Sequence, residues 1–251
     1  MANPFDLSGR VAIVTGANTG IGQGIAVALA EAGASIAAVG RSSMDETGSM
    51  VTKAGARFQV INADLGTIEP VKRIVSETLS TFGALDILVN NAGIIRRADA
   101  IDFTEEDWDA VIDVNLKTAF FLSQAAGRHM IEKGRGKIIN VASLLSFQGG
   151  IRIPSYTASK SGLAGITRLL ACEWAGKGVN VNAIAPGYFV TNNTTALRED
   201  PDRNAAILAR IPAARWGAPA ELGGAAVFLA SSASDYVHGT ILPVDGGWLA
   251  R

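Results

Sequence analysis

Short runs of β-type residues alternate with longer helical patterns from one end of the chain to the other. Several of the short runs are continuously apolar, as expected of strands that are buried on both faces of a parallel sheet. The expected strands are Val11–Thr15, Ser35–Val39, Arg57–Ile61, Ile87–Val89, Lys137–Val141, Val179–Ile184 and Thr240–Val244. The expected helices lie near Ile21–Ala32, Ile68–Phe82, Glu105–Met130, Ser159–Ala175 and Ala220–Ala230. The pattern predicts the α/β class, with one doubly wound parallel sheet of seven strands and helices on both faces.

All of residues 1–251 are expected to form this single domain, because no linker, repeat or charge block divides the chain. Thr104, followed by three acidic residues, is predicted to cap the helix that starts at Glu105. The segment at about 186–215 is too long and irregular for a plain connection, so we interpret it as a lid over a binding site.

The composition excludes several classes of protein. The 22 Lys and Arg nearly balance the 23 Asp and Glu, so the chain lacks the basic face that a nucleic-acid partner requires. Two histidines and the single Cys172, expected in the core, rule out a disulfide framework and argue against a metal site. The uncharged stretches 11–30 and 178–197 contain glycine, asparagine or proline, so no membrane span is expected. We therefore expect a cytoplasmic protein.

A glycine-rich turn joins the first expected strand to the first expected helix. It reads Thr15-Gly16-Ala17-Asn18-Thr19-Gly20-Ile21-Gly22, with the spacing Gly-x3-Gly-x-Gly. Glycines at such a turn let a pyrophosphate approach the backbone at the positive N-terminus of the helix. The turn therefore predicts a dinucleotide site that includes Gly16, Asn18, Thr19, Gly20, Ile21 and Gly22.

Tyr156 and Lys160 are spaced as i and i+4, so on a helix they share one face. A free tyrosine has a pKa near 10, and a neighbouring ammonium is expected to lower it toward neutrality. Tyr156 then suits a general acid or base acting on a ketone or alcohol. Ser143, thirteen residues earlier at the end of a strand, suits a hydrogen bond to the carbonyl oxygen. Each feature alone has an ordinary structural explanation, but together they predict catalysis.

The order of these motifs resembles that of the short-chain dehydrogenase/reductase family over essentially the whole chain. Asn90-Asn91-Ala92-Gly93, Asn115, Ser143, Tyr156-x3-Lys160 and Pro186-Gly187 follow one another as they do in that family. The resemblance implies a Rossmann-type NAD(P) domain with Asn115, Ser143, Tyr156 and Lys160 as catalytic residues. In such a site Lys160 also holds the nicotinamide ribose, and Asn115 supports a water chain. Further cofactor contacts implied by the resemblance are Asp64, Leu65, Asn91, Ala92, Gly93, Tyr156, Lys160, Pro186, Gly187 and Thr191.

The end of the second expected strand bears on the choice between NAD(H) and NADP(H). An acidic residue there would bind the adenosine 2′-hydroxyl, but this chain has Gly40-Arg41-Ser42-Ser43. A guanidinium at Arg41 and a hydroxyl at Ser42 suit a 2′-phosphate. The residues therefore favour NADP(H), with NAD(H) left open.

Longer strings narrow the resemblance to family members that act on deoxy sugar acids. These strings are 90–97, 146–156, 210–217 and 245–251. A sugar acid needs a cation for its carboxylate, and Arg96, Arg97 and Arg152 fall in loops at the carboxyl ends of strands. We predict a substrate site that contains Arg96, Gln148, Arg152 and Tyr188.

Three other functions stay open at this point. One is an enzyme of the same family that acts on gluconate, and another is a reductase of 3-oxoacyl thioesters. The third is a dinucleotide sensor without catalysis, although Ser143, Tyr156 and Lys160 are all present. The resemblance also implies a homotetramer, in which the helices near Glu105–Met130 and Ser159–Ala175 pair and the run at Trp248-Leu249 is buried against a neighbour.

Overall fold

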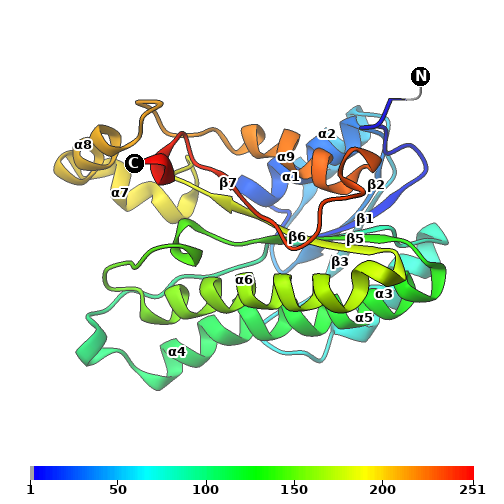
Figure 1. Cartoon of the computed structure of the whole chain (residues 1–251), viewed down its shortest axis with the longest axis horizontal. Helices are drawn as coiled ribbons and strands as arrows, with labels where there is room; N and C mark the ends of the chain where they lie inside the picture. The colour runs from blue at the N-terminus through cyan, green and yellow to red at the C-terminus, as the bar shows by residue number, and fades with distance from the viewer. Residues whose placement is uncertain (1–2) are drawn as a thin grey trace.

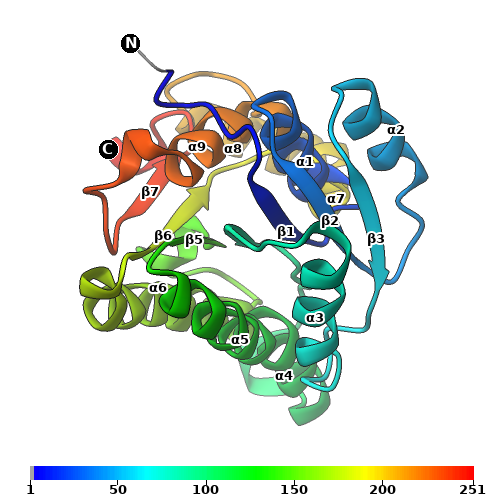
Figure 2. The same ribbon diagram turned by 90° about the vertical axis from the view of Figure 1, so that its right-hand side faces the viewer.

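The computed structural model describes residues 3–251 as a seven-stranded parallel sheet with helices on both sides (Figures 1 and 2). The strands are β1 (Val11–Thr15), β2 (Ser35–Gly40), β3 (Phe58–Asn62), β4 (Ile87–Asn90), β5 (Gly136–Val141), β6 (Val179–Pro186) and β7 (Ile241–Val244). Their order across the sheet is β3-β2-β1-β4-β5-β6-β7. The chain therefore adds strands outward from β1 to β3 on one side, and then from β4 to β7 on the other side, so the strand order reverses between β1 and β4. A crevice at the carboxyl ends of the strands beside such a reversal is where open α/β sheets bind ligands.

Nine α-helices connect the strands within the described residues. They are α1 (Gly20–Glu31), α2 (Asp45–Lys53), α3 (Val71–Phe82), α4 (Glu105–Ile112), α5 (Thr118–Lys133), α6 (Pro154–Trp174), α7 (Thr195–Glu199), α8 (Pro201–Arg210) and α9 (Gly223–Ala230). Figure 2 shows α1, α2 and α9 on one side of the sheet and α3 to α6 on the other. None of the helices formed by residues 3–251 combines the length and the apolar character needed to cross a bilayer.

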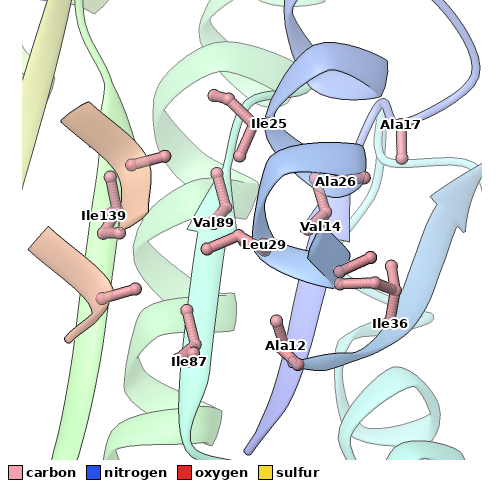
Figure 3. Packing of buried hydrophobic residues seen from close by; sticks show 14 of the residues in the cluster. Ala12, Val14, Ala17, Ile25, Ala26, Leu29, Ile36, Ile87, Val89 and Ile139 are labelled. Atoms are coloured by element: carbon pink, nitrogen blue, oxygen red, sulfur yellow. The ribbon is translucent and has the colours of Figure 1, made fainter. Parts of the chain in front are cut away.

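Alternating side chains of each strand build two separate cores. Val14 of β1 packs with Ile25 and Leu29 of α1 on one face (Figure 3). Ile13, one residue earlier on the same strand, packs with residues of α3, α5 and α6 on the other face. Because both faces are covered, most positions of the central strand β1 and its neighbour β2 are apolar and buried, as the continuous apolar runs predicted.

The predicted elements are confirmed with shifts of a few residues, but two expectations were wrong and one helix was not predicted. The helix expected over Glu105–Met130 is interrupted by a π-helical segment at Asp113–Lys117. The segment at 186–215, which was expected to be irregular, holds helices α7 and α8, and residues 45–53 form α2, which was not predicted. Thr104 does cap α4, because its side chain accepts a hydrogen bond from the Asp107 amide at 3.2 Å.

Two side chains lie in surroundings that differ from the expected ones. Cys172 is exposed, since it lies on the face of α6 opposite to the buried Leu170, Ala171 and Trp174. Trp248 is only 4% exposed within its own chain, where it packs with Ile207 and Ile211. Its burial therefore needs no neighbouring subunit.

Candidate active site

A cavity of about 760 Å³ lies at the carboxyl ends of β1, β4, β5 and β6. It is lined by every residue that was predicted to bind the cofactor, namely Gly16, Asn18, Thr19, Gly20, Ile21, Gly22, Arg41, Ser42, Asp64, Leu65, Asn91, Ala92, Gly93, Tyr156, Lys160, Pro186, Gly187 and Thr191. Ser143 lines the same cavity. The structure thus brings the glycine-rich turn and three of the four predicted catalytic residues to one site.

The glycine-rich turn is shaped for close approach of a ligand to the backbone. Gly16 and Gly20 have φ angles of +64° and +58°, in the left-handed region that glycine adopts without strain. A Cβ at Gly22 would overlap the carbonyl oxygen of Gly16. Helix α1 begins at this turn, and the side chain of Thr19 does not cap it. An open helix N-terminus in a glycine cradle fits the pyrophosphate of a dinucleotide.

The turn after β4 holds the glycine-rich turn in place. The Asn91 amide nitrogen donates to the carbonyl oxygens of Thr15 at 2.9 Å and Gly16 at 3.1 Å. In return, the Thr15 hydroxyl accepts hydrogen bonds from the backbone amides of Asn91 and Ala92 at 2.9 and 3.0 Å. The two turns at the reversal of the sheet are therefore fastened together before any ligand binds.

Arg41 lies at the end of the cavity that is formed by β2 and β3. Its guanidinium lies 3.5 Å from the Asp64 carboxylate, and the two side chains are 68% and 58% exposed. Such an exposed ion pair contributes little to stability, so its groups can take new partners readily. Ser42 lines the cavity beside Arg41. These residues fit the phosphorylated adenosine of NADP(H).

Tyr156 and Lys160 lie in the first two turns of α6, which begins with Pro154 at a position where proline is favoured. The Lys160 ammonium is 5.6 Å from the centre of the Tyr156 ring and donates to the Val141 carbonyl oxygen at 2.6 Å. Lys160 is 3% exposed, and its burial lowers its pKa to about 8.

The pKa of Tyr156 is raised, which is opposite to the direction expected from the sequence. Burial raises this pKa, while the hydrogen bond with Ser143 and the charge of Arg97 lower it. Lys160 is not among the groups that lower this pKa, and its ammonium donates to the Val141 carbonyl oxygen. Ser143 and Arg97 are thus the groups that favour the phenolate in the ligand-free protein.

Asn115 lies behind the cavity, in the π-helical segment between α4 and α5. Its side-chain amide exchanges two hydrogen bonds with the backbone of Ile94, at 2.8 and 2.9 Å. It also donates to the Ser159 hydroxyl at 3.3 Å, and Ser159 donates to the Tyr156 carbonyl oxygen at 2.9 Å. A π-bulge often marks a functional site, and here it directs a buried amide toward the helix turn that carries Tyr156.

The predicted substrate residues are less well gathered than the cofactor residues. Arg96 lines the cavity but pairs with Asp107 at 3.0 Å. Arg152 pairs with Asp99 at 2.9 Å and does not line the cavity. Both guanidinium groups thus have a carboxylate partner, although these ion pairs are exposed, like that of Arg41, and can be exchanged for a new partner.

Gln148 and Tyr188 also lie outside the residues that line the cavity. Tyr188 packs against the rings of Trp216 and Trp248, with ring centres 5.4 and 4.7 Å apart. The Gln148 side chain accepts hydrogen bonds from Arg210 and Trp248. Both residues belong to the packing under the lid.

Arg97 is not among the residues that line the cavity, but it contacts one that is. It donates to the Asn193 carbonyl oxygen at 3.2 Å, and Asn193 lines the cavity. Among residues 3–251, no carboxylate lies within ion-pair distance of Arg97, and its charge acts on Tyr156. The sequence prediction chose Arg96 and Arg152 over Arg97, because the ion-pair partners of the three arginines are not visible in the sequence.

Several lining residues were missed from the sequence. Phe189 and the turn Asn192–Thr194 close the lid side of the cavity. The one local signal for that turn was Thr191 followed three residues later by Thr194, which form a capping box in the structure.

Comparisons with known proteins agree with this geometry. A family profile described as Enoyl-(Acyl carrier protein) reductase matches residues 16–249. The 2-dehydro-3-deoxy-D-gluconate 5-dehydrogenase of Escherichia coli K12 is 58% identical over 248 residues, which cover 98% of each chain. A crystal structure from Agrobacterium tumefaciens with bound NADP is 58% identical, covers 100% of both chains and has a TM-score of 0.93. The gluconate 5-dehydrogenase of Burkholderia cenocepacia J2315, in complex with NADP and tartrate, is 40% identical with a TM-score of 0.93 and covers 99% of this chain and 98% of its own.

Proposed function

Because the chain belongs to the short-chain dehydrogenase/reductase family, we propose that it interconverts a hydroxyl and a keto group of a deoxy sugar acid. The substrate is of the 2-dehydro-3-deoxy-D-gluconate or 2-deoxy-D-gluconate type, as in the relative from E. coli with 58% identity. The observation that carries the proposal is the meeting of Ser143, Tyr156 and Lys160 in one cavity with a dinucleotide cradle.

The glycine-rich turn, Asn91 and Thr191 would hold a nicotinamide dinucleotide along the cavity. That cofactor, when bound, supplies or accepts the hydride. Tyr156 donates a proton to the keto oxygen from its phenol, or removes it from the hydroxyl in the opposite direction. The Ser143 hydroxyl orients the same oxygen, and Asn115 supports the turn of α6 that carries Tyr156 through Ser159. Lys160, whose ammonium donates to the Val141 carbonyl oxygen in the cavity lining, would hold the nicotinamide ribose.

Arg97 is the residue best suited to the carboxylate of the acid. Its charge is not neutralised by an acidic side chain in the described part of the protein, and a guanidinium fork matches a carboxylate in geometry. The same charge favours the phenolate of Tyr156. Arg97 thus takes the role that the sequence gave to Arg96 and Arg152.

NADP(H) is the preferred cofactor in this proposal, with NAD(H) as the alternative. The exposed guanidinium of Arg41 supports it, and so do the relatives whose crystal structures hold NADP. We also propose that the protein is a cytoplasmic homotetramer. Trp108 on α4 and Leu169 on α6, which are 40% and 50% exposed, support pairing through these helices.

Initial rates on a panel of acids test the substrate and the cofactor together. The panel contains 2-dehydro-3-deoxy-D-gluconate, 2-deoxy-D-gluconate, gluconate and a 3-oxoacyl thioester, each with the phosphorylated and the unphosphorylated cofactor. We expect the highest kcat/KM with a deoxy sugar acid. A higher value with gluconate would assign the chain to the activity named for the B. cenocepacia relative, and a higher value with the thioester would overturn the sugar-acid proposal.

A further inference from the structure

The two ends of the lid are joined to each other, and its helix α8 packs on the loop that follows Ser143. Val190, near the start of the lid, donates a backbone hydrogen bond of 2.9 Å to Gly217, just after its end. Ile207 and Ile211, at the end of α8, form an apolar cluster with Leu144 and Trp248. Leu144 directly follows Ser143, so the position of α8 is linked to that of a catalytic residue.

The side chain of Gln148 makes two polar contacts beside this apolar cluster. The Gln148 side-chain oxygen accepts a hydrogen bond from the Trp248 indole nitrogen at 3.1 Å and one from the Arg210 guanidinium at 3.3 Å. The Arg210 guanidinium also lies 4.0 Å from the centre of a Trp248 ring. An amide oxygen has two lone pairs, so both are used by these donors.

The C-terminal turn is a fixed support for this contact. The Asp245 carboxylate accepts hydrogen bonds from the backbone amides of Gly247 and Leu249 at 2.8 and 2.9 Å. Arg251 donates to the carbonyl oxygen of Ala209 at 2.6 Å, next to Arg210 in α8. Figure 1 shows the C-terminus beside α8. The C-terminal turn is therefore bonded to the end of helix α8.

We propose that Gln148 is a positioning residue that fixes the lid, through Arg210 and Trp248, over the loop that carries Ser143. Within residues 3–251, its bond to Arg210 is the one side-chain hydrogen bond between residues 144–153 and α8. Gln148 therefore acts on substrate binding through the lid, without touching the substrate. The kinetic part of this inference rests on the proposed function.

The test compares variants that remove the acceptor or one of its two donors. Gln148→Met keeps the size of the side chain and removes the acceptor of both bonds. Trp248→Phe keeps an aromatic ring and removes one donor, and Arg210→Met removes the donor on α8. Each is expected to raise KM for the sugar acid about five- to tenfold, as for the loss of one hydrogen bond with a buried partner. The value of kcat and the cofactor Kd should change less than about twofold.

A conservative variant and a double variant distinguish a positioning role of Gln148 from a general loss of structure. Gln148→Glu keeps the acceptor oxygen and should restore KM to within about twofold of wild type. A double variant that combines Gln148→Met with Trp248→Phe or with Arg210→Met should be no worse than Gln148→Met alone, because Gln148→Met already removes both bonds. A rise in KM with Gln148→Met but with neither donor variant would mean that Gln148 contacts the substrate, and additive effects would mean that no coupling exists. Either result overturns the inference.

Limited digestion with trypsin tests the inference independently of the substrate. Arg198, Arg203, Arg210 and Arg215 lie in or beside the lid helices and are the cleavage sites. Gln148→Met and Trp248→Phe should be cut there several times faster than wild type and Gln148→Glu. Equal cleavage rates would overturn the role of Gln148, whereas faster cleavage in a protein that turns over no sugar acid would overturn only the proposed function.

Discussion

Tyr156 is half-buried in surroundings that oppose its ionisation, and the groups that favour its phenolate are Ser143 and Arg97. The Lys160 ammonium lies over the Tyr156 ring, 5.6 Å from its centre, and donates to a backbone carbonyl oxygen. The general acid and base chemistry of the site therefore depends on more than the Tyr–Lys pair that is visible in the sequence. Arg97 would have two roles, because the cation that we propose for the substrate carboxylate also favours the phenolate of Tyr156.

Arg41 provides a test of cofactor choice. Loss of a charge-assisted hydrogen bond, worth about 1.5–3 kcal/mol, should make Arg41→Ala bind NADPH about one to two orders of magnitude more weakly. NADH lacks the phosphate and should lose little. Arg41→Asp should repel NADPH and reverse the preference toward NADH. Titration of both cofactors into wild type and the two variants measures this, and equal NADPH affinity in wild type and Arg41→Ala would disprove the phosphate contact.

Lys160 provides a test of pH dependence. Its pKa is about 8 in the folded protein and 10.5 ordinarily, so between these values only the unfolded chain carries the proton. Stability rises with pH wherever the unfolded state binds more protons, so burial of Lys160 destabilises the fold fully below pH 8 and progressively less up to pH 10.5.

Lys160→Met removes this titration. We expect the stability of wild type to rise relative to that of Lys160→Met by of order 3 kcal/mol as the pH increases through this window. Urea unfolding of the two proteins across the same range measures the difference. A difference that stays constant with pH would show that the folded-state pKa of Lys160 is not lowered.

At the scale of secondary structure, the sheet could be predicted because strands buried on both faces leave an uninterrupted apolar run in the sequence. The π-helical segment at Asp113–Lys117 could not, because its residues continue an ordinary helical pattern. Helix α8 had a local signal that was not used, since Asp200 caps it and Pro201 occupies its first position.

The cofactor part of the site was predictable for the same kind of reason. Its residues lie in short motifs at the ends of strands, and all of them line the cavity. The substrate part depends on contacts between distant residues, such as Gln148 with Trp248 and Arg97 with Asn193. Ion pairs such as that of Arg152 with Asp99 likewise decide which guanidinium is free, and no local pattern encodes them.

The junction of β1 and α1 provides a test at this scale. Gly22→Ala forces a methyl group against the Gly16 carbonyl oxygen, so it should lower the free energy of unfolding by about 1–3 kcal/mol. It should also weaken NADPH binding about tenfold or more, because the phosphate cradle must shift. Gly224→Ala in α9 is the matched control, since a Cβ there meets open space. Calorimetric titration of both variants measures the effect, and similar NADPH affinities for the two would contradict the cradle.

At the scale of the whole molecule, the proposed lid at 186–215, the C-terminal turn and the loop that follows Ser143 contact one another. Trp248 joins the three, since it packs with the end of α8, lies in the C-terminal turn and donates to Gln148. This arrangement leaves the outer faces of α4 and α6, with Trp108 and Leu169, available for assembly.

Light scattering tests the assembly. A homotetramer should give a mass about four times the 26.0 kDa of the chain at micromolar concentration. Trp108→Glu together with Leu169→Glu should lower that mass by placing charges in the paired helices. A wild-type mass of about 26 kDa would rule out the tetramer.

The central claim is that Tyr156 transfers the proton when the enzyme acts on a deoxy sugar acid. Turnover of 2-dehydro-3-deoxy-D-gluconate by wild type and Tyr156→Phe, with the cofactor Kd measured in parallel, tests it most directly. We expect kcat to fall at least ~10²-fold, the usual effect of losing a general acid or base, while the cofactor still binds. If Tyr156→Phe instead kept more than half of the wild-type rate, Tyr156 would have no part in the proton transfer and the account would be wrong.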